Sequence, residues 1–132
     1  MCIFCKIVNG EIPSYKIYED NDFLAFMDIS PATIGHTLVI PKKHYDSIFS
    51  LDEDTKIFSL VIKLSKVIKE ALDLEGMNIL NNNGEVAGQS VKHFHIHLIP
   101  RYKDDNLKMN LPESTFNKKE FEKIQKRILE KI

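Results

Sequence analysis

Three histidines alternate with apolar residues in the stretch His93-Phe94-His95-Ile96-His97. Because side chains alternate across a strand, an extended backbone would put the three imidazoles on one face and Phe94 and Ile96 on the other. Such a row supports two kinds of chemistry. It could bind a catalytic zinc ion that activates water, or one neutral imidazole could attack phosphorus while its neighbours orient it and handle protons. The spacing alone does not separate the two.

Cys2 and Cys5 are the only cysteines, and their C-x2-C spacing directs two sulfurs to one point. Metal binding and simple burial both remain open, because a tetrahedral zinc site needs two further ligands from elsewhere in the chain. The first residues have neither the basic start nor the apolar stretch of a signal peptide, so we expect a cytoplasmic protein. A disulfide is not expected in that reducing compartment.

Short apolar runs bounded by Pro, Gly and polar residues predict five strands, at residues 15–19, 23–27, 37–40, 77–82 and 93–100. Apolar positions that recur every three or four residues predict a long helix at about residues 54–72, and another from about residue 116 onward. Ser50 and Glu53 resemble a capping box, and Gly76 suits the helix stop. We therefore predict an α+β fold, an antiparallel sheet of about five strands with one long helix and a C-terminal helix.

The chain has 132 residues, the length of one domain that buries its own core without disulfides. Its hydrophobic content of 43%, charged content of 28% and net charge of −1 are typical of a globular protein. We expect neither nucleic acid nor a membrane as a partner.

The extended motif His93-Phe94-His95-Ile96-His97-Leu98-Ile99 resembles the signature of the histidine triad (HIT) superfamily. Further segments are similar to its Hint-like branch in the same order, namely Phe4-Cys5-Lys6-Ile7, Glu11-Ile12-Pro13, residues 24–31, residues 35–44 and Ala87-Gly88-Gln89-Ser90-Val91. The resemblance implies the HIT fold, as a single domain over residues 1–132. Its motif-bearing core covers about residues 2–101, and residues 102–132 form an extension without a counterpart that we can assign.

The resemblance also implies an activity, the hydrolysis of purine nucleoside 5'-phosphoramidates of the AMP-amine type through a nucleotidyl-histidine intermediate. By the family pattern, His95 is the nucleophile, His97 contacts the phosphate and serves the leaving group, and His93 orients His95. His36 matches a family histidine close to the active site. Ser90 would hold phosphate oxygens, together with backbone N–H groups of Gly88 and Gln89.

The nucleotide pocket is implied by the same resemblance. Asp28 matches the carboxylate that accepts hydrogen bonds from the ribose hydroxyls, and Asn82 matches a position near phosphate and ribose. The nucleobase, of AMP or GMP, would be lined by Phe4, Ile7, Ile12, Phe26 and Ile29. Taken alone, each of these apolar residues is more often a core residue.

Some HIT proteins with a C-x2-C start bind a structural zinc ion, and the matching ligands here are Cys2, Cys5, His44 and His93. Such a closed tetrahedral site leaves no position for activated water, so no cofactor is expected for the chemistry. The resemblance further implies a homodimer that joins its sheets edge to edge.

Three alternatives remain open at this point. One is a dinucleoside polyphosphate hydrolase or nucleotidyltransferase of the same fold, which differs only in its leaving group. Another is a nucleotide-binding module without catalysis, although an intact triad of histidines would then be superfluous. The third is an enzyme in which the histidines bind a catalytic zinc ion that activates water.

Overall fold

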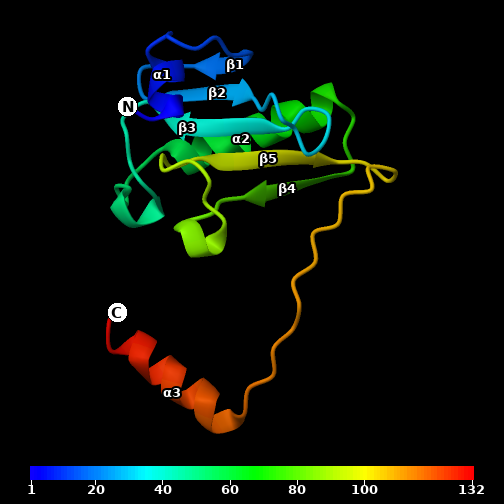
Figure 1. Ribbon diagram of the computed structural model, residues 1–132. Coiled ribbons are helices and arrows are strands. Elements are labelled where there is room, and N and C mark those ends of the chain that lie inside the picture. Colours follow the sequence, from blue (N-terminus) through cyan, green and yellow to red (C-terminus); the bar gives the residue numbers. More distant parts are fainter.

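Five strands form one antiparallel sheet in the computed structural model, which describes all 132 residues (Figure 1). The order across the sheet is β1-β2-β3-β5-β4. The strands are β1 (Lys16–Glu19), β2 (Phe23–Met27), β3 (Thr37–Pro41), β4 (Gly76–Leu80) and β5 (Ile96–Arg101). The predicted α+β class and the five antiparallel strands are thereby confirmed. None of the helices is both long and apolar enough to cross a membrane.

Two helices cover opposite faces of the sheet and create two cores. The long helix α2 (Ile57–Ala71) packs on β3, β4 and β5, and its residues Leu60 and Leu64 join Val39 and Leu98 in one core. The short helix α1 (Ile3–Val8) covers the other face. Its core contains Phe4, Ile7, Leu24, Phe26, Leu38 and Ile40. Successive residues of β2 and β3 alternate between these cores, as strand geometry requires.

The ends of α2 differ from the prediction. Ser50 does not cap α2, which begins at Ile57, where the hydroxyl of Thr55 accepts from the N–H of Ile57 (3.3 Å). Instead Ser50 pairs with Ser47 around the 3-10 turn η1 (Ile48–Ser50). The helix ends at Ala71, and Asp73 takes the left-handed conformation at φ 51° that we assigned to glycine. Aspartate tolerates that conformation better than most residues. Gly76 belongs to β4 instead.

Helix α1 was not predicted, because its six residues are too few to display helical periodicity. Its start depends on Cys2, whose sulfur accepts a hydrogen bond from the backbone N–H of Cys5 (3.2 Å) and so acts as the N-cap. The same cap geometry brings the two sulfurs to 3.2 Å from each other. The C-x2-C motif therefore both begins a helix and gathers two potential ligands.

The C-terminal helix α3 (Lys118–Leu129) stands apart from the sheet, at the end of an extended segment (Figure 1). A capping box between Asn117 and Glu120 begins the helix. Every residue from 108 to 132 is exposed to solvent. The predicted helix is confirmed, but it does not pack on its own domain.

Candidate active site

The histidine stretch enters the sheet later than predicted. Strand β5 begins at Ile96, so His93 and His95 precede it. The backbone N–H of Phe94 donates to the carbonyl of Tyr45 (2.7 Å), which lies in a loop, so Phe94 does not pair with a neighbouring strand.

The predicted alternation nevertheless holds through this stretch. Phe94 and Ile96 lie in the core beneath α2. On the opposite side, the ring of His95 lies edge-on to Phe4 of α1, with centroids 5.1 Å apart, and 5.0 Å from the ring of His97. The histidines therefore share the α1 face of the sheet.

The hydrogen bonds of His95 leave one ring nitrogen available. Its Nδ1 lies 2.7 Å from the carbonyl oxygen of His93, which can only accept, so Nδ1 carries the proton. Nε2 therefore has a free lone pair. Burial lowers the pKa of His95 below 6.5, although the bond to His93 opposes that shift, and the ring stays neutral at pH 7. The amide of Asn81 also donates to the carbonyl of His95 (2.9 Å), which fixes the backbone.

His36 and His97 form a relay whose proton positions follow from one backbone group. The N–H of Ala32 donates to Nδ1 of His36 (2.9 Å), so a neutral His36 carries its proton on Nε2. That nitrogen lies 2.9 Å from Nδ1 of His97 and donates to it. His97 must then carry its own proton on Nε2. Burial and the neighbouring histidines lower the pKa of His97 to about 4, which keeps the ring neutral.

Asp28 joins this relay from the end of β2, with one carboxylate oxygen 3.7 Å from Nε2 of His36. Asp28, His36 and His97 are close enough together to suggest a metal site. However, Nε2 of His36 and Nδ1 of His97 already share one proton. A metal between these nitrogens would require His36 to lose its only ring proton. Asp28, His36 and His97 therefore form a hydrogen-bonded relay, which argues against a catalytic zinc ion that activates water.

We expect the low pKa of His97 to make stability depend on pH. Between pH 6.5 and about 4 the unfolded chain protonates this imidazole while the folded protein does not. The unfolded state then binds more protons, so the free energy of unfolding falls as pH falls through this range. Urea denaturation at pH 7 and pH 4.5 should show a smaller fall for His97→Gln than for the wild type. Equal falls would contradict the assignment.

The loop before the triad contains the 3-10 turn η2 (Glu85–Ala87). The N–H groups of Gly88 and Gln89 donate within this turn, to Glu85 (2.9 Å) and Gly84 (3.1 Å). They are therefore already engaged, and Ser90 is the residue of this group whose N–H and hydroxyl remain free. Ser90 borders a cavity of about 390 Å³ lined also by Gly84, Glu85, Gln89 and Lys92.

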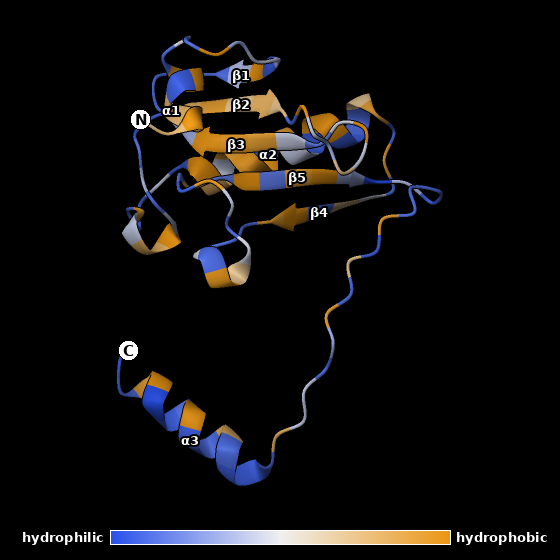
Figure 2. Ribbon diagram, in the orientation of Figure 1, coloured by the Kyte–Doolittle hydropathy of each residue, from blue (hydrophilic) through white to orange (hydrophobic).

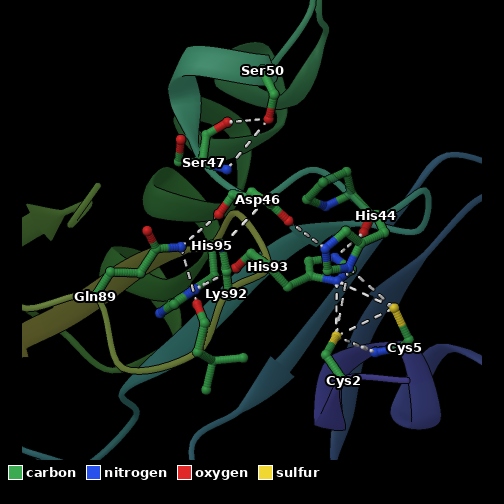
Figure 3. A network of polar contacts seen from close by, with 12 residues as sticks. Cys2, Cys5, His44, Asp46, Ser47, Ser50, Gln89, Lys92, His93 and His95 are labelled. Carbon is green, nitrogen blue, oxygen red and sulfur yellow. Dashed lines mark hydrogen bonds and ion pairs between the residues drawn. The ribbon is translucent and has the colours of Figure 1, made fainter. Parts of the chain in front are cut away.

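The side chain of Gln89 braces this loop and does not point into the site. Its oxygen accepts from the N–H of Gly84 (2.8 Å), while its nitrogen donates to the carbonyls of Val91 (3.0 Å) and Asp46 (2.6 Å) (Figure 3). One amide thus fastens both ends of the loop to a neighbouring segment. Asn82 holds the middle more weakly, by a bond of 3.4 Å to the carbonyl of Gly88.

The residues expected around the nucleobase are only partly gathered. Phe4, Ile7 and Phe26 are buried in the core beneath α1, and Ile12 packs against that core. This group lies beside His95 through the ring of Phe4. Ile29 is 81% exposed and stands outside it.

Four side chains converge at the start of α1, from three separate parts of the chain (Figure 3). Nδ1 of His44 lies 3.7 and 3.4 Å from the sulfurs of Cys2 and Cys5, and Nδ1 of His93 lies 3.4 and 3.6 Å from them. Tetrahedral Zn–S and Zn–N bonds of about 2.3 and 2.0 Å place sulfur and nitrogen ligands roughly 3.5 Å apart. The four residues therefore fit a zinc ion.

The remaining ring nitrogens support this fit. Nε2 of His93 donates to the carbonyl of Pro41 (2.8 Å), and Nε2 of His44 donates to Asp46 (2.8 Å). Both imidazoles therefore present Nδ1 to the two sulfurs, as outer partners orient metal-bound histidines. Asp46 was not predicted from the sequence, although its position two residues after His44 was a visible signal.

Comparisons with known proteins identify relatives of this chain. The HIT domain family matches residues 9–104. An uncharacterized HIT-like protein of Methanocaldococcus jannaschii is 52% identical, over 80% of this chain and 82% of its own length. An adenosine 5'-monophosphoramidase of Schizosaccharomyces pombe is 38% identical over 99% of this chain and 98% of its own length.

Solved structures extend the agreement to the whole chain. The crystal structure of a HIT family protein from Bacillus anthracis superposes with a TM-score of 0.91 at 46% identity, and covers 99% of this chain and 96% of that one. The fold, the matched residues and these relatives lead to one conclusion. The chain belongs to the HIT superfamily, in its Hint-like branch.

Proposed function

We propose that this protein hydrolyses purine nucleoside 5'-phosphoramidates, with His95 as the nucleophile on the α-phosphorus. The observation that carries the proposal is the pair of neighbouring neutral rings, in which His95 offers a lone pair and His97 an N–H. A nucleophile beside a hydrogen-bond donor for the leaving nitrogen supports displacement of an amine from phosphorus. The relative from Schizosaccharomyces pombe named an adenosine 5'-monophosphoramidase supports the same substrate class.

The reaction proceeds in two displacements. In the first, Nε2 of His95 bonds to phosphorus and the P–N bond to the amine breaks. The leaving nitrogen accepts a hydrogen bond from the Nε2–H of His97 and takes its proton from water, because neutral His97 has no second proton to give. In the second, water attacks phosphorus and releases a proton to solvent, and the bond to His95 breaks to release the nucleotide.

The other roles follow from position. Asp28 accepts hydrogen bonds from the ribose hydroxyls, and Asn82 lies near phosphate and ribose. Ser90 holds a phosphate oxygen through its free N–H and hydroxyl. The core group around Phe4 borders the base, which is adenine or guanine. We further propose a structural zinc ion on the four residues at the start of α1, and a cytoplasmic location, where the thiols remain reduced.

The test compares leaving groups. Turnover is measured with fluorogenic adenosine and guanosine 5'-phosphoramidates and with a diadenosine polyphosphate, and quenched samples are analysed by mass spectrometry under denaturing conditions. We expect faster turnover of the phosphoramidates and a protein species heavier by one nucleotidyl group. Faster turnover of the dinucleotide would favour the polyphosphate hydrolase, and binding without turnover of any substrate would favour a nucleotide-binding module.

The bracing role of Gln89 gives a further prediction. Gln89→Ala leaves the N–H of Gly84 unpaired and frees both ends of the loop that carries Ser90. We expect kcat/KM for the phosphoramidate to fall about 10- to 100-fold, because misplaced positioning groups cost that order of activity. The matched control is Val86→Ala, a fully exposed position in the same loop, which should keep wild-type kinetics. Equal values for both variants would contradict the bracing role of Gln89.

A further inference from the structure

The backbone of His95 lies just outside the sheet. Pairing of β5 with β4 ends where His97 lies opposite Leu80. Pairing of β5 with β3 ends where Ile96 lies opposite Val39. His95 therefore precedes both ladders, although the residue is only 4% exposed. A buried carbonyl that has no strand partner needs another hydrogen-bond donor.

A side chain supplies this donor where the ladder ends. Three asparagines follow strand β4, and Figure 2 shows the change from hydrophobic to hydrophilic residues at this point. The amide nitrogen of the first, Asn81, donates to the carbonyl of His95 (2.9 Å). The oxygen of the same amide accepts a hydrogen bond from the side-chain nitrogen of Asn83. Both ends of the Asn81 side chain are thereby engaged, which fixes its orientation.

Asn83 connects this pair of amides to a second segment of the chain. Its oxygen accepts from the backbone N–H of Ile48 (2.8 Å), at the start of η1 and 35 residues away in sequence. Two amides in series therefore link the backbone of His95 to the η1 turn. Because every polar atom of the two amides has a partner, the pair holds one geometry.

The segment just before Ile48 holds two other parts of the active site. The carbonyl of Tyr45 accepts from the N–H of Phe94 (2.7 Å), the residue before the nucleophile. The carbonyl of Asp46 accepts from the side chain of Gln89 (2.6 Å), which braces the loop before the triad (Figure 3). One segment thus serves as a common support for that loop and for the backbone on both sides of the triad's central ring.

The middle asparagine makes a weaker contact than its neighbours. Asn82 matches the family position near phosphate and ribose, yet its only hydrogen bond is the one of 3.4 Å to the carbonyl of Gly88. Asn81 and Asn83 hold His95 instead, and all three asparagines are partly buried. The run therefore divides its work between the substrate side and the nucleophile.

We propose that Asn81 and Asn83 are positioning residues that align His95 for attack on phosphorus. The carbonyl of His93 holds the His95 ring at Nδ1, and Asn81 holds the backbone at the carbonyl of His95. Two fixed points leave Nε2 little freedom to move. An in-line displacement depends on that alignment, because small misplacements of a reacting group lower the rate steeply. This inference rests on the proposed function.

The first test measures kcat for an adenosine 5'-phosphoramidate and the affinity for AMP. We expect Asn81→Ala to lower kcat about 10- to 100-fold and to leave the AMP dissociation constant within about threefold of wild type. Asn83→Ala should lower kcat by a smaller factor. Because Asn83 acts through Asn81, the double variant should be no slower than Asn81→Ala alone. The matched control is Asn21→Ala, an exposed asparagine between β1 and β2, which should keep wild-type kinetics.

A second variant separates positioning from a loss of packing. Asn81→Asp keeps the shape of the side chain and the acceptor for Asn83, but an oxygen replaces the donor to His95. We expect it to lose as much kcat as Asn81→Ala. A merely structural role predicts a lower Tm and unchanged kcat of the folded protein, so thermal denaturation accompanies each kinetic measurement.

Nitrogen-15 NMR tests the position of the ring without any substrate. The Nδ1–H of His95 donates to the carbonyl of His93, and the same stretch of backbone carries both groups. In Asn81→Ala this proton should exchange with water at least about tenfold faster than in the wild type, because the stretch is less restrained. Asn21→Ala should show the wild-type exchange rate.

The outcomes distinguish this inference from the proposed reaction. Wild-type kcat in Asn81→Asp, or losses that add up in the double variant, would overturn the positioning role while the reaction stands. If the wild type turns over no phosphoramidate, the reaction is rejected, and the NMR measurement alone decides the positioning role. An unchanged exchange rate in Asn81→Ala would then overturn it.

Discussion

Removal of the His95 ring should lower kcat for an adenosine 5'-phosphoramidate by at least about 10⁴-fold, the order that loss of a nucleophile costs. The lone pair on Nε2 of His95 has no substitute, because His97 holds its proton on the nitrogen that faces away from His36. The measurement is turnover by the wild type and by His95→Ala, together with mass spectrometry for the nucleotidyl adduct. The nucleotidyl adduct should be absent from the His95→Ala variant.

Two controls make this result specific. Binding of AMP by His95→Ala, measured by calorimetry, should persist and show that the pocket is intact. Wild-type turnover should continue in a strong chelator for as long as the protein stays folded, because no metal takes part in the reaction proposed. A fully active alanine variant, or loss of activity by chelation of folded protein, would disprove the mechanism.

Loss of the zinc ligands should have the second largest effect, on stability. We expect the wild type to purify with about one zinc ion per chain and the double variant Cys2→Ser, Cys5→Ser with none. Its Tm should fall by at least about 10 °C, because binding of a structural metal contributes directly to folding. Metal analysis and thermal denaturation measure both quantities.

The matched comparison is the wild type treated with chelator, which should melt like the double variant and recover when zinc is added back. The double variant should not respond to zinc. A wild type that contains no zinc, and whose Tm does not change on addition of the ion, would show that Cys2 and Cys5 are only buried thiols.

The sequence predicted the sheet well because each strand carries its own local pattern. Phe23 to Met27 is an apolar run with clear ends, and the structure has β2 at the same residues. The alternation from His93 to Leu98 also holds, since burial of Phe94 and Ile96 beneath α2 fixes which side each residue takes. Local pattern and core packing agree in these elements.

The errors arose where distant groups decide. Ser50 pairs with Ser47 in a separate turn, so it does not cap helix α2, which starts later, at Ile57. The protonation of His97 depends on Ala32, which donates to His36 from a loop far along the chain. The hydrogen bonds by which the Gln89 side chain braces the loop could not be predicted either. One of them goes to the carbonyl of Asp46, which is 43 residues away in sequence.

Residue 93 has two separate connections. Its imidazole faces the sulfurs of Cys2 and Cys5, while its carbonyl holds the ring of His95. An ion bound there is connected to the nucleophile through His93 and does not contact the ring of His95 itself. Cobalt(II) accepts the same donor atoms as zinc but absorbs visible light, and its colour follows ligand geometry. A cobalt-loaded protein would therefore report optically on each step at His95, from inside the molecule and without a labelled substrate.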